Sequence, residues 1–154
     1  MLRRIRRALI PLIAVLLGVS LAGPASAATV IDVVDAVRIE DGAAVQVTVA
    51  VTCDPLPSAD DHASLGVSVY QGRSRSARYI EGFASYGQIG GVGLTCDGTS
   101  HTYSLTARPT RFYADRRFRS GPVRVDAFVN ICTLVAPASW WCETISSTPE
   151  EFRL

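Results

Sequence analysis

The 154-residue chain contains no lysine, so arginine supplies all 15 of its basic side chains. The glycine-rich stretch at 87–93 therefore lacks the lysine that a P-loop places on phosphate, and no helical pattern follows it. Histidine occurs only twice and none of the four cysteines stands in a Cys-x-x-Cys pair, which disfavours a zinc site. A formal charge of +1 excludes a strongly basic nucleic-acid binder, and the length excludes a large multidomain enzyme.

The first 27 residues have the composition of a secretory signal peptide. Four arginines precede an uncharged run over 8–22, and Ala25-Ser26-Ala27 then offers the small residues that a signal peptidase accepts. The run is shorter than the roughly 20 residues of a membrane-spanning helix. We expect cleavage after Ala27, with an uncleaved N-terminal anchor as the alternative. The remaining secreted domain, residues 28–154, carries 11 arginines against 14 acidic residues, a formal charge of −3.

The cysteines predict two disulfides, because an even number in a small exported chain is typical of a disulfide framework. Cys132 and Cys142 are close in sequence with Pro137 between them, which favours a local bridge. Cys53 and Cys96 then remain, and each falls on the apolar face of an alternating strand. We therefore expect the pairs Cys53–Cys96 and Cys132–Cys142.

Period-two alternation of apolar and polar residues predicts strands throughout residues 28–154, with no helical segment. The clearest alternations lie at 45–53 and 123–131. Shorter candidate strands lie at 30–39, 65–70, 79–86, 89–96, 103–107 and 152–154. Seven or eight short strands in a domain of this size favour an all-β, immunoglobulin-like Greek-key sandwich. A small β-barrel is the alternative.

Three segments carry a family resemblance. They are the valine-alternating strand that ends at Cys53, the run Cys-Asp-Gly-Thr-Ser-His-Thr-Tyr at 96–103, and Gly-Pro-Val-Arg-Val at 121–125. With them the chain resembles a family of small secreted actinobacterial β-sandwich proteins that are immunoglobulin-like and uncharacterised. The all-arginine basic set fits a GC-rich genome. The resemblance implies an exported β-sandwich and brings no catalytic residues with it.

The sequence offers few groups for catalysis. His62 and His101 are interpreted as loop histidines, and Ser85 lacks the first glycine and the following helix of a nucleophile elbow. The acidic residues of the segment 54–61 match no calcium-binding spacing. We therefore expect no catalytic residue, no metal site and no cofactor.

Two arginine-rich segments form the most unusual predicted surface. Residues 108–119 hold five arginines, one acid and three aromatic residues, a formal charge of +4. Arginine forks suit phosphate or carboxylate groups, and aromatic rings can stack on a ligand. The predicted binding residues are Arg73, Arg75 and Arg78 in the shorter segment, and Arg108, Arg111, Phe112, Tyr113, Arg116, Arg117, Phe118 and Arg119 in the longer one.

Trp140 and Trp141 are a second candidate contact, beside Cys142. Adjacent side chains of an extended segment point in opposite directions, so we expect one ring to be exposed. An exposed tryptophan on a constrained loop can serve as a contact anchor or as a platform on which a sugar stacks.

These features predict a secreted, non-enzymatic binding module that uses loops on a rigid β-framework. The expected partner is an anionic cell-wall polymer or another protein. We expect no specific nucleic acid and no membrane span after signal cleavage. One alternative function is a secreted protease inhibitor that presents the loop between Cys132 and Cys142, and another is a small hydrolase.

Overall fold

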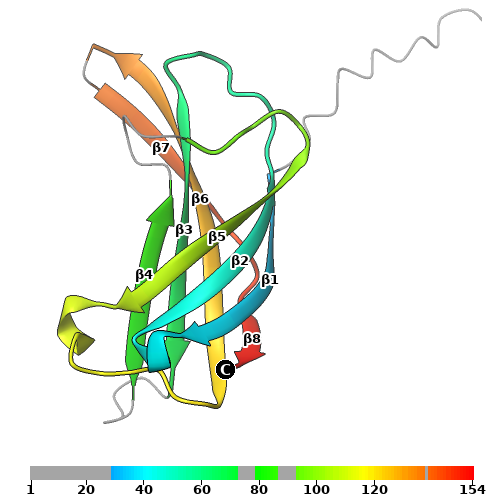
Figure 1. Ribbon diagram of the computed structural model, residues 1–154. Helices are drawn as coiled ribbons and strands as arrows, with labels where there is room; N and C mark the ends of the chain where they lie inside the picture. Colours follow the sequence, from blue (N-terminus) through cyan, green and yellow to red (C-terminus); the bar gives the residue numbers. More distant parts are fainter. Residues whose placement is uncertain (1–28, 73–78, 87–92, 138) are drawn as a thin grey trace, which may run out of the picture.

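Strands dominate the computed structural model, which describes residues 29–72, 79–86, 93–137 and 139–154 (Figure 1). The eight strands of these ranges are β1 (Val30–Ile39), β2 (Ala44–Thr52), β3 (His62–Gln71), β4 (Ile80–Tyr86), β5 (Ser100–Pro109), β6 (Pro122–Ala136), β7 (Ser139–Ser146) and β8 (Glu150–Arg153). The all-β class predicted from the alternation is confirmed. No helix in the described part is long and apolar enough to cross a membrane.

All the strand pairs are antiparallel and form one sheet. The strand order is β1-β2-β5-β4-β3-β6-β7, and β8 pairs with the early part of β6, which β7 leaves free. The link between β4 and β5 consists of only two residue pairs, Gly82–Pro109 and Phe83–Arg108. The sheet is curled into a half-barrel, and β1 at one end contacts β6 and β8 at the other (Figure 1).

Alternation along the strands gives the sheet an inner face, which forms the core, and an outer face (the side turned away from the core). The two alternations that are clearest in the sequence become β2 and the first part of β6, and their apolar residues are buried as predicted. Burial of these β-branched side chains is the main favourable term in folding. Three strands supply most of the core: Val45, Val47, Val49 and Val51 on β2, Ala63, Leu65, Val67 and Val69 on β3, and Val123, Val125, Ala127 and Val129 on β6.

The prediction of a strand at 89–96 is wrong for the four residues of it that the structure describes. Residues 93–96 are not a strand, and the rest of the prediction, together with most of the glycine-rich stretch, lies outside the described residues. Leu94 is nevertheless buried, and its N–H donates to the Ala63 carbonyl at 3.1 Å. The segment therefore packs against the start of β3 without joining the sheet.

Both predicted disulfides are present. Cys53 at the end of β2 is bonded to Cys96, which precedes β5, and Cys132 on β6 is bonded to Cys142, its register partner on β7. The bonds join residues that are 43 and 10 positions apart. In the chain-entropy model they stabilise the fold by about 4 and about 3 kcal/mol. Two disulfides indicate an oxidising, extracellular environment.

Candidate functional site

The segment 108–119, here called the arginine loop, is held to the domain by its own charged and aromatic residues. Arg108 donates to both carboxylate oxygens of Glu40, at 2.6 and 2.8 Å, and this pair lowers the pKa of Glu40. Arg116 Nη1 donates to the carbonyl of Tyr79 at 2.8 Å, and Arg117 donates to the carbonyl of Glu40 at 3.4 Å. Much of the predicted anion-binding capacity is therefore engaged within the molecule.

Phe118 is not a surface contact, and its prediction as a binding residue is wrong. Its side chain is only 1% exposed and belongs to the core. Its N–H donates to the Gly42 carbonyl at 2.8 Å, and its ring covers Gly82, where a Cβ would lie 2.7 Å from the ring. Sequence reasoning missed this role because Phe118 stands between two arginines, in a segment without alternation.

The rest of the loop is more exposed. Phe112 is 75% exposed, and the guanidinium of Arg111 lies 5.0 Å from the centre of its ring. Tyr113 is half-buried and meets Tyr79 edge-on, with ring centres 5.6 Å apart. The backbone N–H of Arg119 donates to the side chain of Gln71. The arginine loop thus runs along the end of β3 and the start of β4.

Arg73, Arg75 and Arg78 lie outside the described residues. The residues on either side of that segment, Gly72 and Tyr79, both line the groove described next.

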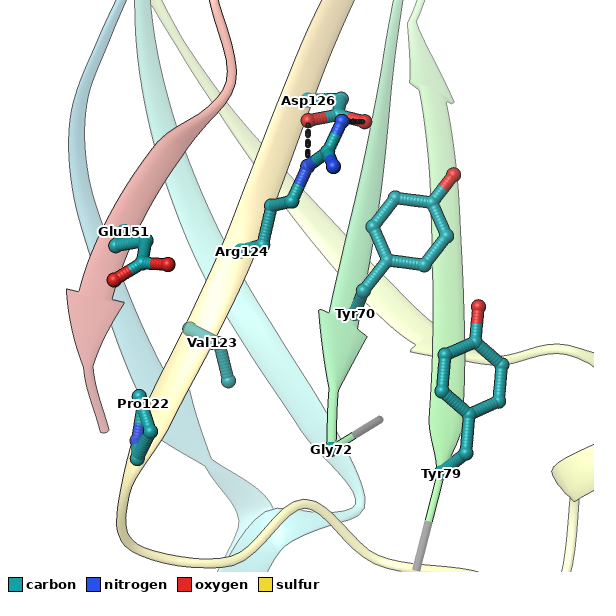
Figure 2. Close-up of a pocket in the computed structure, with 8 residues that line it drawn as sticks. All are labelled: Tyr70, Gly72, Tyr79, Pro122, Val123, Arg124, Asp126 and Glu151. Carbon is teal, nitrogen blue, oxygen red and sulfur yellow. Dashed lines mark hydrogen bonds and ion pairs between the residues drawn. The ribbon is translucent and has the colours of Figure 1, made fainter. Parts of the chain in front are cut away.

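An open groove of about 670 Å³ lies on the outer face of the sheet, where β3, β6 and β8 run side by side (Figure 2). We call it the tyrosine groove. Its lining residues are Tyr70, Gly72, Tyr79, Pro122, Val123, Arg124, Asp126 and Glu151. This volume is within the usual range of small-molecule sites.

Two tyrosines form one wall of the groove. The rings of Tyr70 and Tyr79 are nearly parallel, with an interplanar angle of 27° and centres 6.4 Å apart. Figure 2 shows them side by side, with both hydroxyls pointing the same way along the sheet. Burial, and to a lesser degree the charge of Glu81, raise the pKa of Tyr79. The pair offers an aromatic surface with two hydroxyls at its border.

Arg124 is fixed in the middle of the groove. Its Nε and Nη2 donate to the two carboxylate oxygens of Asp126, at 3.0 and 3.1 Å, and this pairing raises its pKa. Nη1 has no hydrogen-bond partner among the described residues. With Glu151 opposite (Figure 2), the described lining residues include one cation and two acids, a formal charge of −1.

The alternation along β3 and β6 already places Tyr70, Arg124 and Asp126 on the polar face of their strands. In the sequence each of the three appears as an ordinary exposed strand residue, so none was predicted as a site residue. Only the register, which sets Tyr70 opposite Arg124, brings them together.

The two tryptophans lie on opposite sides of the β6–β7 hairpin. Trp141 pairs with Thr133, in line with the inner face, and is 60% exposed near the hairpin tip. Trp140 pairs with Leu134 on the outer face, and its ring packs edge-on against His62, with centres 4.7 Å apart and 36% of the residue exposed. The expectation of an exposed tryptophan is therefore met by both residues.

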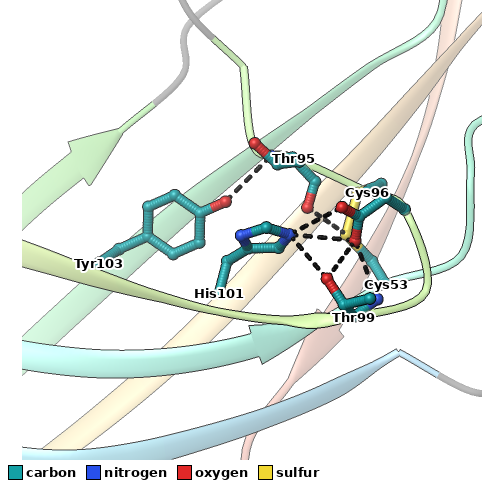
Figure 3. A network of polar contacts seen from close by, with 7 residues as sticks. Cys53, Thr95, Cys96, Thr99, His101 and Tyr103 are labelled. Atoms are coloured by element: carbon teal, nitrogen blue, oxygen red, sulfur yellow. Dashed lines mark hydrogen bonds and ion pairs between the residues drawn. A yellow bond between two sulfur atoms is a disulfide. The ribbon is translucent and has the colours of Figure 1, made fainter.

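His101, Asp97 and Thr99 form a hydrogen-bonded cluster beside the Cys53–Cys96 disulfide (Figure 3). His101 Nε2 lies 3.0 Å from Asp97 Oδ1 and 3.1 Å from Thr99 Oγ1, and the Thr99 hydroxyl donates to Asp97 at 2.7 Å. In a hydroxyl–histidine–acid triad the two partners meet different ring nitrogens. Here both meet Nε2, so the cluster joins the turn to β5 without the geometry of a proton relay.

The last residue of the acidic segment 54–61, Asp61, has a structural role. Asp61 is buried, and its two carboxylate oxygens accept from the backbone N–H groups of Ser58 and Leu134, at 3.2 and 3.3 Å. Within the described ranges, no group of three or more histidine, cysteine or acidic side chains is placed to hold a metal ion.

Comparisons of the chain with protein-family models, with curated proteins and with solved structures gave no match.

Proposed function

We propose that this chain is a secreted, non-enzymatic binding module of immunoglobulin-like Greek-key architecture. The strand order supports the architecture in part: lettered A to G along the chain, the first seven strands run A-B-E-D-C-F-G. Strand D pairs with C over seven positions and with E over only two, so the two halves are A-B-E and D-C-F-G, whereas an immunoglobulin constant domain has A-B-E-D and C-F-G. The two register pairs between β4 and β5 then mark the corner between the halves. The disulfides and the apolar stretch near the N-terminus support secretion.

We further propose that the module binds a neutral carbohydrate in the tyrosine groove. The observation that carries this proposal is the paired surface of Tyr70 and Tyr79 beside the fixed Arg124–Asp126 pair. Faces of sugar rings that carry C–H groups stack on aromatic rings, while their hydroxyls both donate to carboxylates and accept from guanidinium groups. This ligand class uses every kind of group that the groove presents.

The charge of the groove favours a neutral ligand over an anionic one. Among the described lining residues two acids stand against one arginine, which disfavours a polyanion at this position, since like charges in an interface disfavour binding. The sequence prediction of an anionic cell-wall polymer depended on the arginine loop, where Arg108 and Arg116 are engaged within the molecule. The groove therefore supports a different ligand class from the one that the arginine count predicted.

The protease-inhibitor alternative finds less support. A protease cleft receives an extended segment free of strand pairing, whereas the ladder between β6 and β7 runs from Phe128–Ser146 to Ala136–Ser139. The hairpin is paired almost to its tip.

The proposal is tested by calorimetric titration with a panel of neutral oligosaccharides: β-glucan, xylan, mannan and chitin fragments. We expect at least one to bind, and we expect Tyr70→Ala and Arg124→Gln each to weaken that binding roughly tenfold or more, as for a central contact residue. Phe112→Ala is the matched aromatic control on the arginine loop and should leave the affinity unchanged. A chain that binds no member of the panel, or that binds only polyanions through the arginine loop, would overturn the proposal.

A further inference from the structure

We infer that the carbohydrate site extends beyond the tyrosine groove and receives a polysaccharide chain along the outer face of β3, β6 and β7, as far as Trp140. This inference rests on the proposed function. It concerns the length of the ligand, which the groove alone does not define.

Three aromatic pairs occur at regular steps along this outer face. The first is Tyr70 with Tyr79 in the groove. The second is Phe83 with Phe128, whose rings are nearly parallel, at 22°, with centres 6.2 Å apart. The third is His62 with Trp140 near the hairpin tip.

The spacing of the pairs follows from β3 and its register. Tyr70, Gly66 and His62 are four residues apart on β3, and Phe128 is the register partner of Gly66. At about 3.4 Å per residue the steps are about 14 Å, and the whole path is about 27 Å long. A path of this length suits a chain of several sugar units better than a single sugar.

Gly66 explains why the middle pair lies flat. A Cβ at this position would overlap the Phe128 ring, so the ring can rest on the backbone of β3 only because the residue is glycine. Phe128 thereby covers Gly66, which is buried, while Phe83 beside it stays 46% exposed. The pair therefore forms a low platform across β4, β3 and β6.

The stretch between the aromatic pairs is polar, and its one acid in the described part of β3, β6 and β7, Asp126 opposite Ser68, is paired with Arg124. The other residues are Ser64 and Ser68 on β3, and Asn130 and Thr144 on β6 and β7, which are joined by a hydrogen bond of 2.6 Å. Small hydroxyl and amide side chains leave the path low and offer hydrogen bonds to sugar hydroxyls. A protein partner or a second copy of the chain would call for a broader apolar centre, as stable interfaces have.

The test is a series of oligomers of the sugar that binds in the panel: disaccharide, tetrasaccharide and hexasaccharide. We expect the hexasaccharide to bind at least tenfold tighter than the disaccharide. Trp140→Ala should weaken hexasaccharide binding several-fold and leave the affinity for the disaccharide unchanged. Phe83→Ala should likewise weaken hexasaccharide binding. Trp141→Ala is the matched control, since this neighbour lies in line with the inner face, and it should change neither affinity.

Two outcomes overturn the inference while the proposed function stands. One is an affinity that does not depend on chain length, and the other is equal hexasaccharide affinity in Trp140→Ala and wild type. If sedimentation shows a dimer that Trp140→Ala dissociates, the face is an interface between copies and the inference fails. Failure of every oligomer to bind contradicts the proposed function itself.

Discussion

Asp97 fixes the turn between the Cys53–Cys96 disulfide and β5. Its carboxylate accepts from both the hydroxyl and the backbone N–H of Thr99, at 2.7 and 2.9 Å, and contacts His101 (Figure 3). The hydrogen bonds from Thr99, followed by that from His101, lower the pKa of Asp97 from 3.8 to about 2. Folding therefore favours the ionised carboxylate.

The pH dependence follows from the sign of this shift. Because the pKa is lower in the folded chain, the stabilisation is fully present above about pH 4 and is lost as the pH falls towards about 2. Asp97→Asn removes this contribution, so its urea midpoint should fall less steeply between these pH values than that of the wild type. Asp115→Asn, which removes one acid from the exposed part of the arginine loop, is the matched control and should keep the wild-type slope. Identical slopes for Asp97→Asn and wild type would refute this role of Asp97.

At the scale of elements, the arginine loop contributes one of its own residues to the hydrophobic core. Phe118 anchors it in the core, while Phe112, six residues earlier, faces solvent. The two phenylalanines have similar neighbours in the sequence, and the difference arises from tertiary structure. Gly82 leaves room for the Phe118 ring, and Gly42 provides a carbonyl for its N–H.

We predict that Phe118→Ala costs about 3–5 kcal/mol of unfolding free energy, as for other large-to-small changes in a core. Phe112→Ala should stay within about 0.5 kcal/mol of the wild type. Chemical denaturation of both variants measures the difference. Equal costs for the two substitutions would show that Phe118 is not part of the core.

The elements differ in how far the sequence determines them. β2 and the first part of β6 were predicted because each buries the apolar residues of one face, which produces a strict period of two. β7 shows no such pattern because almost all its residues are exposed. Its place depends on pairing with β6 and on the Cys132–Cys142 bond. Residues 93–96 have the alternating pattern of a strand without being one. Leu94 points inward as predicted, although the backbone joins no strand.

At the scale of the whole molecule, the candidate site is a product of strand order. Tyr70, Tyr79, Arg124 and Glu151 come from β3, the start of β4, β6 and β8, which are widely separated in the chain. The sequence indicates which face of each strand is polar, and it does not indicate which strands are neighbours. For this reason the all-β class and both disulfides could be predicted, whereas the tyrosine groove could not.

The arginines of the loop also have a different role in the structure from the one that the sequence suggests. The sequence suggests a loop with a charge of +4 that is available to an anion. In the structure Arg108 is bound to Glu40 and Arg116 to the carbonyl of Tyr79, beside the groove. The loop thus supports the wall of the groove, whose described lining residues carry one arginine and two acids.

The most direct test of this account is a two-dimensional NMR titration of the isotope-labelled chain, residues 28–154, with the neutral oligosaccharide that binds best in calorimetry. Binding in the tyrosine groove predicts that the largest shifts occur at Tyr70, Tyr79 and Arg124, with Phe112 and Trp141 unaffected. Shifts centred on Phe112 and its neighbouring arginines, with none at Tyr70 and Arg124, would contradict the central claim.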